Sequence, residues 1–349
     1  MTKKKILLFL AVVMLYLTAN MSGVFAWFTA YDSKELTVTS GVFVKPYLVS
    51  GEEFNEITSP VKSTVKKVEF MNTIPDLSDY KEGKTKFDVS KEQDGSVIAW
   101  VDENSTMYIG GRGGIIADQS LNTMFSYYTS VKEVIFKKVL NTKDSISARN
   151  MFLSCENLKT TDINNIDTSQ IQNFQMMFAN CQNIVELDIS SWNVKSAKNM
   201  SGMFLNCNTL RTLKMGTKHA ESVETFENMF KDCRYLTALD LSHFYTRDGV
   251  NYKKMFLHSS IQELDLSGFK MREDSNLSQM FGYMDTLDKV YVSENWSETV
   301  KTDCLPFWMC TGLTHNWLSE QEGIDWANYE TGYFTYKQME AECCGQAFL

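Results

Sequence analysis

Residues suited to acid–base or metal chemistry are scarce in this chain, because only four of its 349 residues are histidines. Proline is equally scarce, at four residues, which excludes a proline-rich stalk. Positive charge is in deficit too, since 34 Lys and Arg face 43 Asp and Glu, a net charge of −9. Nucleic-acid binding needs a basic surface to neutralise phosphates, so nucleic acid is not expected as the partner. A hydrophobic content of 44% nevertheless allows a buried core.

The longest apolar run lies at the beginning of the chain. Lys3–Lys5 precede the twelve apolar residues Ile6–Leu17, and a small-residue cleavage motif ends at Ala26. We therefore expect a signal peptide over residues 1–26 and cleavage before Trp27. The mature protein would be extracellular or at the cell surface, with no membrane span. Because the uncharged stretch continues past the cut, an uncleaved N-terminal anchor remains the alternative.

The dipeptide Met-Phe recurs seven times, beginning at residues 124, 151, 177, 203, 229, 255 and 280. The spacing between successive dipeptides is therefore nearly constant along the chain. Recurrence at one period is typical of a solenoid, in which no unit can bury its apolar face alone. We therefore expect an α/β solenoid with seven units over residues 121–313.

Each unit combines two periodicities. Met200, Met203, Phe204 and Cys207 follow the i, i+3, i+4, i+7 spacing of one helix face. A short alternating segment such as residues 187–189 comes before the next such face and is typical of a strand. Helices are about 10 Å wide and paired strands lie about 4.8 Å apart, so this stack should curve. The strands would then line the concave side and the helices the convex side.

The flanking segments are expected to cover the ends of the stack. Residues 27–120 are rich in β-branched and aromatic residues with turn clusters, which predicts a β-rich N-terminal cap. Residues 314–349 contain Gly332–Tyr336, which predicts a closing strand within a C-terminal cap and tail. Gly110–Gly114 lies between apolar segments and lacks the ending of a phosphate-binding loop, so we interpret it as a hairpin turn.

Four of the eight cysteines recur with the units, and they are Cys155, Cys181, Cys207 and Cys233. Stacked helices would hold them about 10 Å apart, whereas a disulfide needs Cα atoms within roughly 7 Å. We therefore expect buried free thiols that act as small hydrophobic residues. Their spacing also lacks the close pairs of a zinc site. The pairing of the other four is left open: Cys304, Cys310, Cys343 and Cys344.

Residues 199–210 read Asn-Met-Ser-Gly-Met-Phe-Leu-Asn-Cys-Asn-Thr-Leu, and Leu-Asp-Leu-Ser occurs at 239–242 and 264–267. Upstream, residues 93–117 contain Gln-Asp-Gly-Ser-Val-Ile-Ala-Trp and two further apolar segments. These strings resemble BspA-like leucine-rich repeat surface proteins over residues 65–313. The resemblance implies a curved leucine-rich-repeat stack with an adhesion or binding role at the cell surface. It implies no catalytic residues.

Residues 27–32 read Trp-Phe-Thr-Ala-Tyr-Asp and continue to Thr-Ser-Gly at 39–41. This segment resembles the mature start of camelysin/TasA-type exported proteins of Gram-positive bacteria. The resemblance implies export, and it provides an alternative function: a structural component of an extracellular matrix or fibre.

A ladder of strand residues is the candidate ligand-binding surface: Asp162, Asp188, Lys214, Asp240, Asp265 and Tyr291. Four residues after the first five lies a second ladder: Ile166, Trp192, Lys218, Phe244 and Phe269. We expect a concave acidic strip, interrupted by solvated Lys214 and Lys218, that binds a host or neighbouring-cell protein or glycan. In the alternative interpretation both ladders belong to the repeat consensus, and each Asp bonds to the neighbouring turn.

The sequence predicts a binding protein and not an enzyme. The four histidines match no Ser/His/Asp, Cys/His or HExxH pattern, so we expect no catalytic residue, no metal site and no cofactor. The expected protein is a monomer that mediates adhesion or macromolecular binding through its solenoid face.

Overall fold

The computed structural model describes residues 27–28, 38–39, 46–272, 274–287 and 289–292. The chain divides into two units, Met1–Lys45 and Pro46–Leu349. In the first, β1 (Trp27–Phe28) pairs antiparallel with β2 (Val38–Thr39). The expected signal peptide, the last four cysteines and the C-terminal cap over 314–349 lie outside the described residues.

The second unit begins with a helix and a sheet. Helix α2 (Gly51–Ile57) follows Ser50, whose Oγ accepts a hydrogen bond from the backbone N–H of Glu53 at 3.2 Å, as an N-cap does. The sheet has the strand order β10-β8-β3-β6-β5-β4. Its strands are β3 (Lys67–Met71), β4 (Lys86–Asp88), β5 (Val97–Val101), β6 (Thr106–Gly111), β8 (Glu133–Ile135) and β10 (Thr160–Thr161).

This sheet joins the N-terminal residues to the repeats. Strands β4, β5 and β6 pair antiparallel, whereas β3 pairs parallel with β6 on one side and with β8 on the other. The strand β8 already belongs to the first Met-Phe unit. The repeats therefore extend a sheet that residues 67–111 begin.

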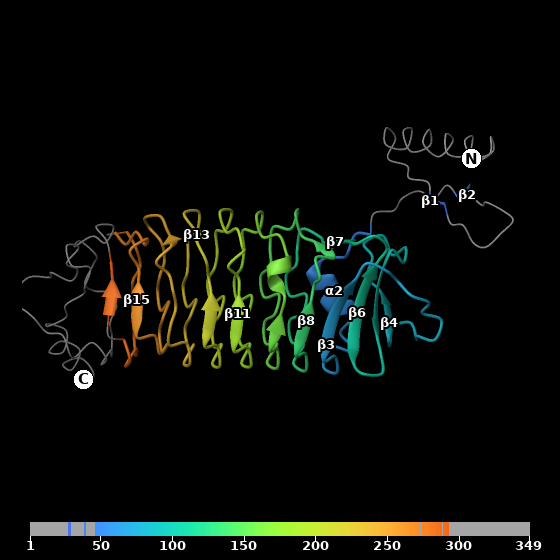
Figure 1. Cartoon of the computed structure of the whole chain (residues 1–349), viewed down its shortest axis with the longest axis horizontal. Helices are drawn as coiled ribbons and strands as arrows, with labels where there is room; N and C mark the ends of the chain where they lie inside the picture. The colour runs from blue at the N-terminus through green and yellow to red at the C-terminus, as the bar shows by residue number, and fades with distance from the viewer. Residues whose placement is uncertain (1–26, 29–37, 40–45, 273, 288, 293–349) are drawn as a thin grey trace, which may run out of the picture. The chain divides into compact units, whose positions relative to one another are not determined.

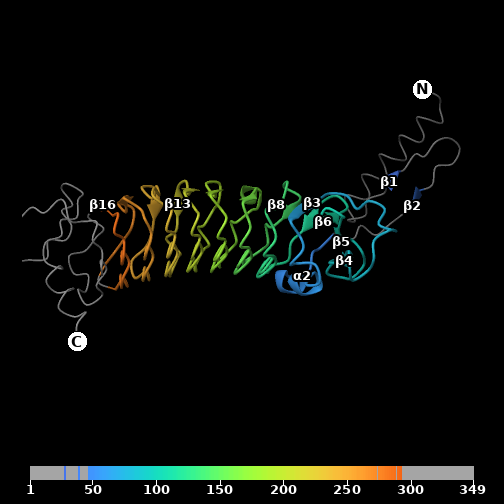
Figure 2. The same cartoon turned by 90° about the horizontal axis from the view of Figure 1, so that it is seen from below.

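The remaining strands are short and pair in parallel. Strand β7 (Ile115–Ile116) pairs with β9 (Leu140–Asn141). Further along the chain β11 (Glu186–Asp188) pairs with β12 (Thr212–Lys214), and β13 (Lys218–His219) with β14 (Phe244–Tyr245). The last pair is β15 (Glu263–Asp265) with β16 (Lys289–Tyr291). Figures 1 and 2 show these units side by side in one row.

The Met-Phe segments are turns and not the helices that the sequence predicted. Among the described residues of the repeats, the only helical element is the 3₁₀ turn η1 (Ile163–Asn165). The backbone N–H of Phe178 donates to Met203 O in the next unit, at 2.9 Å, instead of to a residue four positions earlier. The helical part of the expected α/β class is therefore wrong.

A regular alternation of hydrogen bonds explains both the turns and the helix-like spacing of the apolar residues. The N–H groups of residues 174, 176, 178 and 180 donate to the following unit, and those of 177, 179 and 181 donate three residues back. The residue before each Met and the third residue after it also have positive φ, between 52° and 63°. Left-handed residues cannot continue a right-handed helix. Successive three-residue turns instead bring Phe174, Met177, Phe178 and Cys181 inward at helix-like spacing.

The phenylalanines of the Met-Phe dipeptides form one continuous stack. From Phe152 to Phe281 the rings of successive units are 5.2–5.8 Å apart and inclined by only 7°. Offset stacking at such separations is favourable beyond the area that it buries. All of these rings are buried, within one cluster that extends from Leu48 to Val292.

The row of units is nearly straight in both views, and the curvature expected from the sequence is absent from the described units (Figures 1 and 2). The reason is the missing helices. Paired strands lie about 4.8 Å apart, and the stacked phenylalanine rings are separated by a similar distance. Because both sides of a unit advance by nearly equal steps, neither side becomes concave.

Helix α2 covers the first ring of the stack. The ring of Phe54 meets that of Phe125 edge-on at 5.7 Å. Next to it, the hydroxyl groups of Tyr128 and Thr58 lie 2.5 Å apart, and Asn55 Nδ2 donates to Ser126 O at 3.0 Å. These contacts shield an apolar ring that has no preceding repeat to cover it.

Candidate binding surface

Four of the six residues proposed as a ladder lie in strands, in two pairs that are in register, whereas Asp162 follows β10 and Asp240 lies outside the strands. Asp188 is paired with Lys214 across β11 and β12, and Asp265 with Tyr291 across β15 and β16. Leu187 and Leu213, one position earlier, are buried at 5% exposure. The ladder residues are exposed or half-buried, so they occupy the outer side of the stacked strands.

The aspartates of this ladder make bonds to local turns. Asp188 Oδ1 accepts hydrogen bonds from the backbone N–H and the hydroxyl of Ser190, at 2.9 and 2.6 Å. Asp240 makes the same pair of bonds with Ser242, at 3.0 and 2.6 Å. The serine hydroxyl and the backbone N–H hold the pKa of both carboxyls below the usual range. Each carboxylate therefore stabilises a turn, although it also remains on the surface.

The other two ladder aspartates are also engaged. Asp162 accepts hydrogen bonds from two backbone N–H groups of the preceding unit, that of Phe136 at 2.6 Å and that of Lys137 at 3.0 Å. Asp265 Oδ1 accepts from the backbone N–H of Ser267 at 2.9 Å. These bonds match the interpretation in which each Asp bonds to a neighbouring turn. Lys214 is the exposed exception, with no ion pair among the described residues.

The second ladder is part of the core and not of the surface. Trp192, Phe244 and Phe269 are at most 3% exposed, and Ile166 is 5% exposed. Phe244 and Phe269 stack on each other at 5.5 Å. A turn lies between the two ladders, since the N–H of Phe244 donates to Leu241 O at 2.9 Å. The alternation of the strand therefore does not continue to the second ladder, and its side chains point inward. The proposed binding strip therefore consists of the first ladder alone.

Lys218 is buried, which corrects the expectation that it is solvated. Its side chain occupies the aromatic slot between Trp192 and Phe244, and the residue is 1% exposed. The ammonium group donates to Ser190 O at 3.1 Å, and the charge of Asp188 partly offsets the burial. Burial lowers the pKa of Lys218 to about 8.

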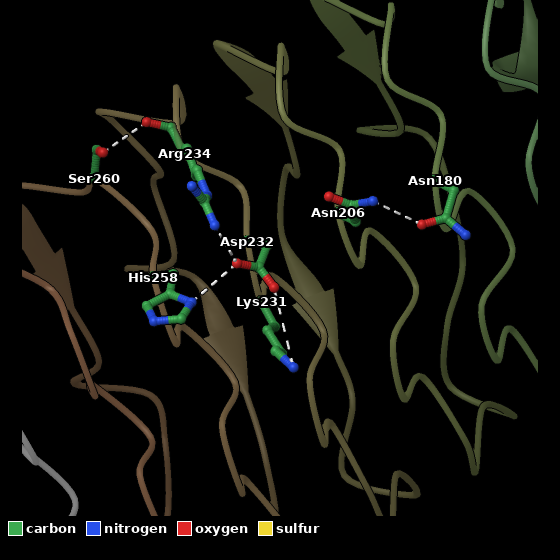
Figure 3. A network of polar contacts seen from close by, with 7 residues as sticks. All are labelled: Asn180, Asn206, Lys231, Asp232, Arg234, His258 and Ser260. Carbon is green, nitrogen blue, oxygen red and sulfur yellow. Dashed lines mark hydrogen bonds and ion pairs between the residues drawn. The ribbon is translucent and has the colours of Figure 1, made fainter.

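A third ladder runs along the turns at the positive-φ position three residues after each Met. Asn206 Nδ2 donates to Asn180 Oδ1 at 2.9 Å, and His258 Nδ1 lies 2.9 Å from Asp232 Oδ1 (Figure 3). Arg234 also reaches Asp232, at 3.3 Å. In the sequence His258 matches no site pattern and stands alone. Alignment on the Met-Phe dipeptides would have revealed this ladder, because its members recur at the same period.

The repeating cysteines are free and buried, as expected. The expected reason was wrong, because the units are separated by the spacing of paired strands and not by the width of a helix. Each thiol instead donates to the carbonyl of a phenylalanine in the preceding unit, as Cys181 Sγ does to Phe152 O at 3.2 Å. Burial raises the pKa of all four thiols, which keeps them protonated. Ser259 fills the next such slot, and its buried hydroxyl has no hydrogen-bond partner among the described residues.

The glycine-rich segment makes a turn but no hairpin. The N–H of Gly114 donates to Gly111 O at 3.4 Å, and φ is positive at Gly113 and Gly114. The strand that follows is β7, which pairs with β9 and not with β6. A Cβ on Gly110 would lie 2.8 Å from the ring of Trp100, so this glycine permits close packing.

Within the described ranges, no group of three or more His, Cys, Asp or Glu residues is arranged to hold a metal ion. The same ranges contain no helix that is long and apolar enough to cross a membrane.

The fold and surface define a protein of stacked units that repeat at the Met-Phe period, with a phenylalanine spine and a polar outer strand face. The chain belongs to the family described as Mycoplasma protein of unknown function, DUF285. Two matches to this family, over residues 119–234 and 212–296, together span just over half of the chain. No curated protein matches the chain. No solved structure matches it either.

Proposed function

We propose that the chain is an exported or surface-associated protein of the BspA-like leucine-rich-repeat type, and that it binds a macromolecule on the outer face of its stacked strands. The proposal is supported by the repeat motifs, by the signal-peptide pattern at residues 1–26 and by the regular stacking of the units. A row of units offers an extended face to a partner that a single unit cannot span. Adhesion to a protein or glycan of a host or neighbouring cell is the function that this arrangement favours.

The observation that carries the proposal is the position of Lys214 on this face. It stands in register beside Asp188, and at the equivalent position one period further along the chain lies the exposed Asp240. The aspartates are occupied by turn bonds, whereas Lys214 is exposed. A charge reversal there alters the local field without disturbing the core.

Lys214→Glu tests the proposal by changing the surface charge by two units at one point. The stability should change by only about 0.5 kcal/mol, since the side chain is exposed. The matched control is Lys195→Glu, an exposed lysine outside the strand face with the same charge change. Binding to immobilised extracellular-matrix proteins and glycans should change for Lys214→Glu only, and more at low than at high salt. Equal binding by both variants and the wild type would reject the strand face as the site.

Size-exclusion chromatography separates this proposal from the matrix alternative. The resemblance of residues 27–41 to camelysin/TasA-type proteins favours a matrix or fibre component as the second candidate. An adhesin should elute as a monomer, whereas a matrix component should elute as polymers. N-terminal sequencing of secreted protein should begin at Trp27, and protein that retains Met1 would contradict the proposed cleavage.

A further inference from the structure

A row of basic residues lies where the chain enters successive strands. Lys66 precedes β3, Lys132 precedes β8 and Lys159 precedes β10, and these three strands are neighbours in the order β3, β8, β10. The backbone N–H of Lys132 donates to Lys66 O at 2.7 Å, and that of Lys159 to Lys132 O at 2.9 Å. In the next two units the equivalent positions are Val185, which carries no charge, and Arg211, and Arg211 N donates to Val185 O at 2.8 Å.

The cations of the basic row are exposed, and the described residues supply them with no ion pair. Lys66, Lys132, Lys159 and Arg211 are all exposed, and none forms an ion pair with another described residue. The neighbouring lysines differ: Lys67 pairs with Glu133 at 3.1 Å, and Lys137 pairs with Glu69. The described part of the chain therefore neutralises adjacent charges but not those of this row, although the net charge of the chain is −9.

The spacing of the basic row selects the shape of its partner. Three lysines recur at about 4.8 Å, and Arg211 extends the row to about 19 Å, as stacked strands dictate. Close like charges repel one another, so they attract an anion that contacts several of them. A single file of cations fits one thin chain with regularly repeated negative charges. A nucleic-acid duplex carries two charged strands and needs a broader basic face.

We propose that the basic row binds a linear sulfated polysaccharide laid along the stacking axis. Single-stranded nucleic acid is the less favourable partner, because its binding sites add exposed aromatic rings on which bases stack. The row itself contains no aromatic residue between Lys66 and Arg211, and the ring of Tyr235, which is 52% exposed, already contacts the guanidinium of Arg211 at 5.0 Å. This inference goes beyond the adhesion proposal, because it concerns a different edge of the strands and does not involve Lys214.

The test measures binding of the full chain to heparin, used as the sulfated polysaccharide, at several salt concentrations. In Lys132→Gln/Lys159→Gln the Kd should rise roughly tenfold or more, and the dependence of log K on log salt should become shallower by about one to two. The control Lys143→Gln/Lys195→Gln removes two exposed lysines from a different edge of the units and should change the Kd less than about twofold. If the first variant loses its fold, Lys66→Gln/Lys159→Gln replaces it.

Three outcomes would overturn the proposal. The first is absence of heparin binding at physiological ionic strength, and the second is equal weakening by both double variants. The third is tighter binding of a single-stranded oligodeoxynucleotide than of heparin at equal charge. Lys214→Glu should leave heparin binding within about twofold, so failure of this proposal and failure of the adhesion proposal can be distinguished.

Discussion

At the scale of single residues, Lys218 departs most from the expectation that charged side chains are solvated, because it is buried in the core. A lysine occupies a slot that aromatic residues fill in neighbouring units, and its ammonium group donates to two backbone carbonyls, Ser190 O at 3.1 Å and Thr217 O at 3.4 Å. Because burial disfavours the charged form, the folded protein holds this proton less tightly than the unfolded chain does. The residue therefore destabilises the fold at neutral pH.

Replacement of Lys218 by Met should stabilise the protein at pH 7. The pKa falls from its ordinary value of 10.5 to about 8 in the fold, which corresponds to roughly 3 kcal/mol before the lost hydrogen bond is subtracted. Between pH 8 and 10.5 the unfolded chain binds more protons, so the wild type gains stability as pH rises. We expect an advantage of about 1–3 kcal/mol for Lys218→Met at pH 7, shrinking toward pH 10, by urea unfolding.

Lys214→Met provides the control for the replacement of a lysine by methionine. Its side chain is exposed, so the substitution should change the free energy of unfolding at pH 7 by only about 0.5 kcal/mol. A wild type that is more stable than Lys218→Met by the same margin at both pH values would show that the buried ammonium has no net cost.

At the scale of the repeating element, the sequence predicts the period but not the backbone conformation. The Met-Phe spacing predicts recurring units, and the burial of Met203, Phe204 and Cys207 follows from the apolar pattern. The i, i+3, i+4, i+7 pattern could not distinguish a helix from successive three-residue turns, because both bring the same residues inward. The decisive features are left-handed residues such as Asn206 and Lys254 and hydrogen bonds between units, which no local pattern encodes.

The sequence likewise predicts only part of the candidate surface. The placement of Asp188 and Lys214 on outer strand positions follows from alternation along a strand. The orientation of Lys218 was not predictable from its offset of four residues, because a turn separates it from β12. The basic row was not predictable either, because its members lie just before the strands, where alternation does not apply.

Phe204 tests the phenylalanine spine. Its ring is 5.8 Å from that of Phe178 and 5.6 Å from that of Phe230, and it is 1% exposed. Phe204→Ala should lower the free energy of unfolding by about 3–5 kcal/mol, because it removes a buried ring and leaves a cavity. The control Leu205→Ala, at a half-buried neighbouring position, should cost less. An unchanged thermal midpoint for Phe204→Ala would contradict the assignment of the rings to the core.

At the scale of the whole molecule, the four repeating thiols report on the integrity of successive units. Cys155, Cys181, Cys207 and Cys233 are all buried and protonated. We expect none of them to react with a maleimide under native conditions, and all of them to react in denaturant. Peptide mass spectrometry distinguishes them from the four cysteines near the C-terminus. Rapid native labelling, or a disulfide among the four, would contradict the buried geometry.

The hydrogen bonds between units also determine how the row would respond to a pulling force. They run along the row, as in the bond from Phe178 N to Met203 O, so tension applied along the row loads the units in series. The interface between two successive units has to break before either unit can open. Each opened unit would release one repeat, or about 90 Å of extended chain. A chain tethered at one end would thus lengthen in steps and limit the tension on whatever it holds.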